Sequence, residues 1–170
     1  MATEFDIRHE FPIDADRFWK EVFFDEAFNR ALYVERLGFP LWQVEEQTTE
    51  PDGTLRRVVR IEPKAEAPAA LRKLVGDSIQ YVERGHWNPS DGRYRFEIEP
   101  SKLADKFETR GEIWVEPKGD GIVRVARQRI AVKVFGVGKV IEGFLERETR
   151  NSFEVGAQFT RQWITEKLSG

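Results

Sequence analysis

Between positions 4 and 11, charged and mostly apolar residues alternate without a break. Phe5, Ile7, His9 and Phe11 fall on one face of an extended chain, and the positions between them are charged. An apolar period of two is typical of a strand that is buried on one side. We therefore predict a half-buried strand over residues 4–11, with His9 as the polar exception on its apolar face.

Two short helices are predicted next. Asp14 and Asp25 are suited to cap helices, because a carboxylate accepts hydrogen bonds from the first free backbone N–H groups. Pro12 ends the preceding strand, and Gly38 is well placed to end the second helix. Apolar side chains recur at helical spacing after each aspartate, at Phe18, Trp19, Val22 and Phe23 and then at Phe28, Ala31 and Leu32.

After Pro40 the pattern predicts six strands joined in hairpins. A short segment rich in Pro, Asp or Gly, the residues that tight turns require, separates the members of each pair. A short helix over 68–75 interrupts the series. Neither face of the last strand is uniformly apolar, which predicts a bulge near Gln128 or Arg129. The paired segments are 41–49 with 54–62, 78–87 with 93–99, and 106–116 with 122–134.

One long helix is predicted at the carboxyl end, because residues 140–168 contain no proline. Glu142 lies away from the apolar stripe that runs along this helix. A carboxylate on an apolar face costs several kcal/mol unless it is compensated, so Glu148 is expected to be paired, to contact ligand or water, or to lie at the rim. At about 3.6 residues per turn, the stripe holds Ile141, Leu145, Glu148, Ser152, Val155, Phe159 and Trp163.

The composition fits one globular domain over residues 1–170. Hydrophobic residues make up 40% of the chain and aromatic residues 12%, which allows a sizeable core and argues against disorder. The net charge of -3 offers no general attraction to a polyanion and argues against nucleic acid as a partner. The sequence has no cysteine, no signal peptide and no apolar run long enough to cross a bilayer. We therefore expect a soluble cytoplasmic protein without stable membrane insertion.

Sequence motifs for a metal, a cofactor or a common hydrolase are not found. The two histidines, His9 and His86, do not make up a zinc site in a chain without cysteine. The segment Phe135–Val140 lacks the first glycine and the hydroxyl residue of a phosphate-binding loop. Neither a Gly-x-Ser-x-Gly elbow nor a dinucleotide fingerprint occurs. We therefore expect no metal and no cofactor, and the sequence does not favour an enzyme.

The order of elements resembles that of the START-like, or helix-grip, superfamily, which includes birch-pollen allergens, bacterial polyketide cyclases and many bacterial proteins of unknown function. The resemblance also rests on the segment Phe11–Trp19, which enters the first helix, and on Gly136 and Gly138 before the last one. It implies an α+β helix-grip fold, in which a curved, seven-stranded antiparallel sheet wraps around the long C-terminal helix. It also implies a cavity between them for a lipid, sterol or polyketide-like molecule.

Residues that would line such a cavity either interrupt an apolar face with a polar group or add an apolar wall. Arg57 and Glu83 would pair if both point inward, and would be solvated on exposed edges. His9 is either a proton-transfer group or a histidine hydrogen-bonded to a neighbour. The aromatic residues are either a ligand wall or ordinary core. The candidates are His9, Trp42, Arg57, Tyr81, Glu83, Phe96, Thr109, Leu145, Glu148, Ser152 and Phe159.

Three functions are consistent with this pattern. Our leading hypothesis is non-enzymatic binding or carrying of a hydrophobic small molecule. The second is a cyclase or dehydratase, in which at least two of His9, Glu83 and Glu148 converge on one cavity to move protons. The third is a protein-interaction module with a filled interior and an exposed apolar patch. Residues 71–75, which combine apolar and basic side chains, are also a candidate lid that touches a membrane during ligand loading.

Overall fold

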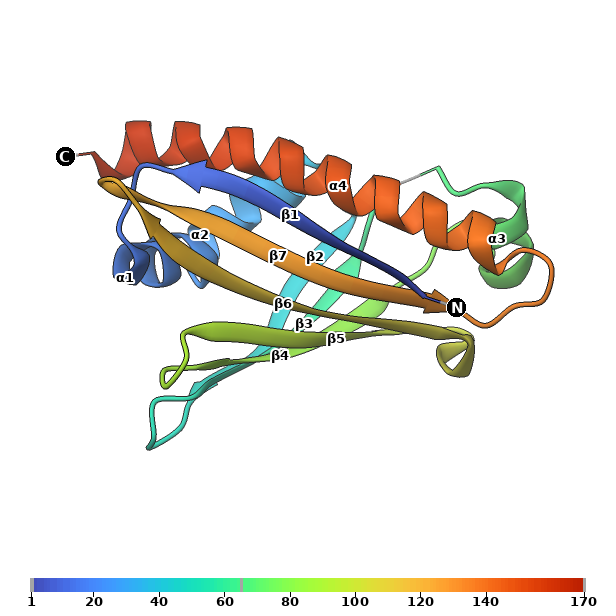
Figure 1. Ribbon diagram of the computed structural model, residues 1–170. Coiled ribbons are helices and arrows are strands. Elements are labelled where there is room, and N and C mark those ends of the chain that lie inside the picture. The colour runs from blue at the N-terminus through green and yellow to red at the C-terminus, as the bar shows by residue number, and fades with distance from the viewer. Residues whose placement is uncertain (1, 65, 170) are drawn as a thin grey trace.

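The computed structural model describes residues 2–64 and 66–169, and its main layers are one sheet and one long helix (Figure 1). The sheet is antiparallel and has seven strands in the order β1-β7-β6-β5-β4-β3-β2. This confirms the predicted α+β fold with a meander of hairpins. The strands are β1 (Thr3–Phe11), β2 (Leu41–Thr49), β3 (Leu55–Glu62), β4 (Tyr81–Asn88), β5 (Arg93–Pro100), β6 (Phe107–Lys118) and β7 (Gly121–Val132).

The helices appear where the apolar periodicity placed them. Asp14 accepts a hydrogen bond from the backbone N–H of Arg17 at 2.9 Å, and Asp25 accepts one from Phe28 at 2.8 Å, so both predicted caps are confirmed. The helices are α1 (Ala15–Arg17) with η1 (Phe18–Phe23), α2 (Glu26–Asn29) with η2 (Arg30–Arg36), α3 (Ala69–Val75), η3 (Ala104–Lys106), and α4 (Gly138–Trp163) with η4 (Ile164–Leu168). Three of the helices, α1, α2 and α4, continue into a wider, π-helical turn, and a separate 3-10 turn precedes β6.

The bulge expected in the last strand is not there. β7 pairs in unbroken register with β1 and with β6, and the register shift of this sheet lies in β2, between Val44 and Glu46. The irregular polarity of β7 has another cause, because Arg124 and Gln128 are buried on the same face as Ala126. The structure tolerates these polar residues inside, so the strand does not need a bulge to turn them outward.

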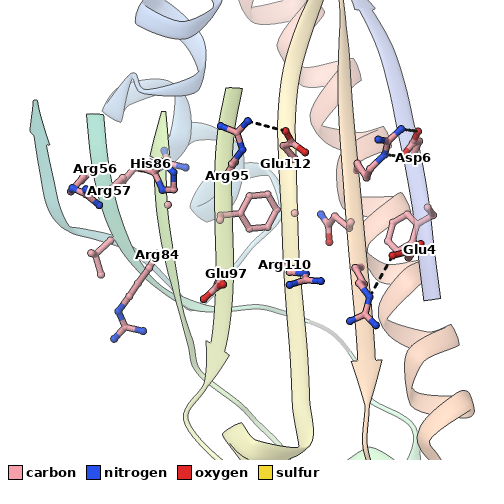
Figure 2. A pocket seen from close by; sticks show the side chains of 18 of the residues that line it. Glu4, Asp6, Arg56, Arg57, Arg84, His86, Arg95, Glu97, Arg110 and Glu112 are labelled. Carbon is pink, nitrogen blue, oxygen red and sulfur yellow. Dashed lines mark hydrogen bonds and ion pairs between the residues drawn. The ribbon is translucent and has the colours of Figure 1, made fainter. Parts of the chain in front are cut away.

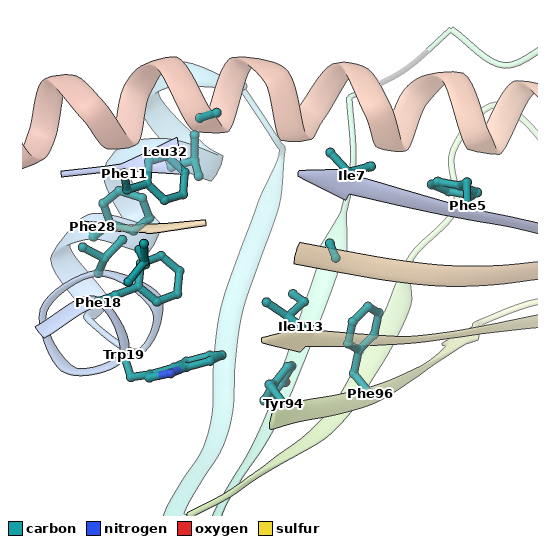
Figure 3. Close-up of a cluster of buried hydrophobic side chains, with 14 of the residues drawn as sticks. Phe5, Ile7, Phe11, Phe18, Trp19, Phe28, Leu32, Tyr94, Phe96 and Ile113 are labelled. Carbon is teal, nitrogen blue, oxygen red and sulfur yellow. The ribbon is translucent and has the colours of Figure 1, made fainter. Parts of the chain in front are cut away.

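The face of the sheet that is turned toward α4, here called the inner face, carries most of the core. α4 crosses β1 and β7, and the α1–η1 and α2–η2 helices close one end of the layer (Figures 1 and 3). Strand alternation puts Phe5 and Ile7 of β1 on this face, as predicted. Buried residues from both layers meet there, including Phe5, Ile7, Phe11, Phe18, Trp19, Phe28, Leu32, Tyr94, Phe96 and Ile113.

Two glycines in the middle of the inner face let aromatic rings lie across the sheet. A Cβ atom on Gly85 would overlap the Tyr94 hydroxyl, and one on Gly111 would overlap the Phe96 ring. Rings that lie over strand glycines cover backbone that no side chain protects. Gly85 and Gly111 therefore shape the floor of the inner face.

α4 is buried at its two ends and not in its middle. Ile141 and Glu142 are buried near its start, and Gly156, Ala157 and Thr160 near its end, whereas none of residues 143–155 is buried. The predicted helix phase was therefore wrong for the glutamates. Glu142 is only 2% exposed, whereas Glu148 is half-buried. The physical reason is that the Glu142 carboxylate accepts hydrogen bonds from the Thr3 hydroxyl (2.7 Å) and the Val132 N–H (2.9 Å).

Candidate functional site

The strand register places all the strand candidates on the inner face. Residues directly opposite each other on neighbouring strands share a face. The row through Phe96 continues through Gly85 to Arg57, and it begins at buried Phe5, which fixes it as inner. Parallel rows on the same face contain the remaining candidates, His9, Trp42, Tyr81, Glu83 and Thr109.

Arg57 and Glu83 form a buried ion pair, as they would if both pointed inward. Arg57 Nη2 lies 3.4 Å from Glu83 Oε2, and the Tyr94 hydroxyl donates to the same oxygen at 2.9 Å. The guanidinium also donates to the Phe23 carbonyl at 3.3 Å. Arg57 is only 5% exposed. The pair therefore lies inside the protein and not on a solvated edge.

Aromatic rings surround this guanidinium. The Arg57 Cζ atom lies 4.8 Å from the Phe23 ring centre and 5.3 Å from that of Tyr94, distances at which a cation is attracted to a ring. Burial opposes its charge, but Tyr94 and Glu83 hold the pKa of Arg57 above its usual value. Burial and the Glu83 charge also raise the pKa of Tyr94. Tyr94 therefore keeps its proton and acts as a hydrogen-bond donor to the carboxylate.

His9 belongs to a second polar cluster, between the sheet and α4. Its Nε2 atom lies 2.8 Å from Glu154 Oε2 on α4, and its Nδ1 atom lies 3.0 Å from Arg124 Nη2 on β7. Arg124 also lies over the rings of Phe11 and Phe153, at 5.0 and 4.8 Å. Burial lowers the pKa of Arg124 to about 10, so it stays charged at neutral pH. The interpretation of His9 as a histidine bonded to neighbours is confirmed.

The structure does not bring the proposed proton-transfer groups together. Three strands, β7, β6 and β5, separate His9 on β1 from Glu83 on β4, which is roughly 19 Å along the sheet at the usual strand spacing. Each group is bound to partners of its own cluster. Glu148 lies half-buried on α4, in accord with the rim position.

The helix candidates flank the stretch of α4 that is not buried. Leu145 and Phe159 pack against the core while staying partly exposed, and Glu148 and Ser152 are half-buried. Thr149 lies seven residues from both Glu142 and Gly156, so it belongs to their stripe, yet it is only half-buried. Opposite, the inner face holds half-buried Ile98 and Thr109, which are neighbours across β5 and β6. These residues define the candidate site, the middle of α4 above the inner face.

Three polar residues of the interior were not predicted as site residues. Tyr94 alternates with Phe96 on β5 and was considered only as an aromatic residue, of a ligand wall or of the core, and not for its hydroxyl group. Arg124 is one of the polar residues of β7 whose presence was attributed to a bulge. Glu142 was placed on the solvated side of α4. Alternation alone identifies Tyr94 and Arg124 as inner-face residues, whereas the partners of Glu142 come from β1 and β7 and leave no local signal.

The outer face of the sheet has a hollow of about 1290 Å³ that the sequence did not predict (Figure 2). Charged side chains of both signs line it. Arg127 binds Asp6 at 2.9 Å, and Arg95 lies 3.4 Å from Glu112. Such exposed pairs add little stability. Exposed charged side chains therefore surround the hollow, and its lining also includes Phe5, Val58 and Phe96.

Metal ligands do not gather anywhere in the part of the chain that the structure describes. No three His, Asp or Glu side chains among residues 2–64 and 66–169 are placed to hold a metal ion. No helix of these residues is both long and apolar enough to cross a membrane.

A sequence family described as "Protein of unknown function (DUF2505)" matches residues 6–164, which is nearly the whole chain. The chain belongs to this family. No curated protein matches the DUF2505 chain by sequence.

Solved structures confirm the helix-grip fold of the DUF2505 chain. TTHA0849 from Thermus thermophilus matches with a TM-score of 0.70 and 15% identity, over 99% of this chain and 100% of that one. The Zhui aromatase/cyclase from Streptomyces sp. R1128 matches with a TM-score of 0.69 and 11% identity, over 100% and 99%. Norcoclaurine synthase from Thalictrum flavum matches with a TM-score of 0.66 and 15% identity, over 98% and 88%. At these identities the likeness shows the fold alone.

Proposed function

We propose that the DUF2505 chain binds a hydrophobic small molecule between the inner face of its sheet and the middle of α4, and carries it without chemical change. The burial of α4 supports this proposal above all. A helix that only covered a core would be buried along its whole inner stripe. Here the stripe is buried at both ends and only half-buried through residues 143–155.

The chemistry of the lining suits an apolar guest with a few oxygen atoms. Small-molecule sites are mostly apolar and contain a few polar groups that orient the ligand. Around this site, aromatic and aliphatic residues surround the Arg57–Glu83–Tyr94 cluster. Among the described residues, the buried Nε–H of Arg57 in this cluster and the indole N–H of Trp87 on the inner face have no hydrogen-bond partner. Since both are donors, a ligand that pairs with them supplies acceptors such as carbonyl or hydroxyl oxygens.

Proteins with the same fold add support at the level of ligand class. Norcoclaurine synthase from Thalictrum flavum has been solved in complex with dopamine and hydroxybenzaldehyde, which are small aromatic molecules. The Zhui protein is an aromatase/cyclase. We favour binding over catalysis for the DUF2505 chain because His9 and Glu83 lie in separate clusters, each already paired.

A pair of neighbouring substitutions on β6 tests this proposal. Thr109 points to the inner face and Arg110 to the outer hollow. In a fluorescence titration with 1-aminoanthracene, an uncharged aromatic probe, Thr109→Trp should weaken binding about tenfold or more, a loss of about 1.4 kcal/mol, because the indole would occupy the proposed site. Arg110→Trp should leave binding unchanged.

Two results would contradict the proposal. One is that the unsubstituted protein fails to bind apolar probes. The other is that Arg110→Trp weakens binding and Thr109→Trp does not, which would move the site to the outer hollow. Thermal unfolding of both variants checks that each is folded.

A further inference from the structure

Three loops meet at the end of the molecule where α4 begins. The backbone N–H of Lys133, after β7, donates to the carbonyl of Lys106, before β6, at 2.8 Å. The Lys102 ammonium donates to the Val75 carbonyl at the end of α3, also at 2.8 Å. Figure 1 shows α3, the β5–β6 connection and the β7–α4 loop together at this end. We call the surface formed by residues 69–77, 101–106 and 133–140 the basic tip.

The large apolar side chains that the described residues expose lie on the basic tip. They are Phe135, Val140 and Leu103. Phe135 is fully exposed, Val140 is 57% exposed and Leu103 is 38% exposed. Gly136, with a φ of 82°, turns the chain directly after Phe135, so the ring projects from the loop. The exposed phenylalanine ring keeps apolar area in contact with water, and insertion into an apolar environment would remove that area from water.

The charge of the basic tip is opposite to that of the whole chain. Six exposed basic residues stand against two exposed acidic residues on it, whereas the chain has a net charge of -3. Lys106 lies 3.7 Å from Asp105, and Lys139 lies 3.8 Å from the buried Glu142, and the excess remains positive. The basic residues are Arg72, Lys73, Lys102, Lys106, Lys133 and Lys139, and the acidic ones are Asp77 and Asp105.

We propose that the basic tip docks on the surface of an anionic phospholipid bilayer. Lysines near such a surface are attracted to acidic headgroups, and a projecting phenylalanine enters the boundary between headgroups and acyl chains. Charge complementarity and the projecting ring therefore favour a bilayer.

The candidate lid takes a different form from the one that the sequence suggested. Leu71 and Val75 of α3 are buried in the core, so they cannot meet a membrane, whereas Arg72 and Lys73 are exposed. α3 supplies charge to the basic tip, and the apolar contact comes from Phe135 on the β7–α4 loop. Exchange of a ligand between bilayer and protein at this end rests on the proposed function, but vesicle binding does not.

Co-sedimentation with lipid vesicles tests the docking surface without any ligand. The full-length protein should bind vesicles of phosphatidylcholine that contain phosphatidylserine, should not bind pure phosphatidylcholine, and should be released by raised salt. Lys73→Glu combined with Lys133→Glu should weaken binding about tenfold or more, since each basic residue near the surface adds attraction to the acidic headgroups. Phe135→Ser should also weaken binding about tenfold, because the apolar anchor is lost.

Lys20→Glu serves as the matched control. Lys20 is an exposed lysine on η1, beside α1 at the opposite end of the molecule (Figure 1), and its substitution should leave binding unchanged. Thermal unfolding should show all variants folded, since the altered side chains are exposed. The proposal is overturned if the protein ignores anionic vesicles, or if the tip variants bind as well as the unsubstituted protein. Neither outcome bears on the binding of apolar probes, so this proposal can fail while the proposed function stands.

Discussion

At the scale of single residues, the protonation state of His9 follows from the groups that surround it. The Arg124 guanidinium has only donors, so Nδ1 of His9 accepts, and Nε2 carries the proton that it donates to Glu154. Burial is the largest influence and lowers the pKa of His9, Arg124 lowers it further, and the bond to Glu154 raises it only in part. His9 is therefore neutral at pH 7.

This predicts a specific pH dependence of stability. Because the pKa of His9 is lower in the folded protein than the 6.5 of a free histidine, the unfolded chain takes up a proton first as the pH falls through 6.5. The folded state then loses stability relative to the unfolded state. We expect the unsubstituted protein to lose more stability between pH 7.5 and pH 5 than His9→Gln, as measured by urea unfolding. Parallel pH profiles for the two proteins would refute this assignment.

The sequence predicted which face of the strand His9 lies on, but not which residues it binds. Alternation along β1 put His9 among Phe5, Ile7 and Phe11, and all four do face inward. Its partner Glu154 lies 145 residues away on α4, and no local pattern encodes that contact. Arg57 and Glu83 are the opposite case, because the sequence suggested that they pair but left their facing open, and the neighbouring strands place both on the inner face.

At the scale of elements, the extent of α4 was predicted correctly, whereas the residues on its buried face were predicted wrongly. The absence of proline fixed its length closely, because proline is the strongest helix breaker. Its phase failed because periodicity assigns a glutamate to the solvated side. Burial opposes the charge of Glu142, but hydrogen bonds from Val132 and Thr3, together with Lys139, lower the pKa of its carboxyl. Glu142 therefore stays charged and ties α4 to β1 and β7.

Two glutamates of α4 give a matched test of this phase. Glu142→Ala should destabilise the protein by about 2–4 kcal/mol, because it leaves the Val132 N–H and the Thr3 hydroxyl without an acceptor. Glu148→Ala should cost less than about 0.5 kcal/mol, as is usual for a partly exposed side chain. Urea unfolding of both variants measures the difference. Equal losses would show that the buried stripe has been assigned to the wrong residues.

The strands were predicted better than the details within them. Turn residues marked the hairpins, and apolar alternation marked the faces. The bulge was misplaced because polarity in β7 was taken as a change of facing, whereas Arg124 is inward and bound to His9. The two strand glycines carried no signal of their role, since only the packed rings of Tyr94 and Phe96 show why a side chain is excluded there.

At the scale of the molecule, the sheet has two faces of different chemistry. The inner face is aromatic, contains the Arg57–Glu83 pair, and lies under a helix that is buried only at its ends. The outer face is lined by exposed charges around its hollow. Our account places an apolar guest on the inner face and a lipid surface at the basic tip, where α4 begins (Figure 1).

Methyl-selective NMR of the protein bound to 1-aminoanthracene tests the central claim most directly. Ile98 and Leu145 line the proposed site from the sheet and from α4, and Val58 lies in the outer hollow. The account predicts intermolecular nuclear Overhauser effects from the probe to the methyl groups of Ile98 and Leu145 and none to Val58. Effects to Val58 without effects to Ile98 and Leu145, or a probe that does not bind, would contradict it.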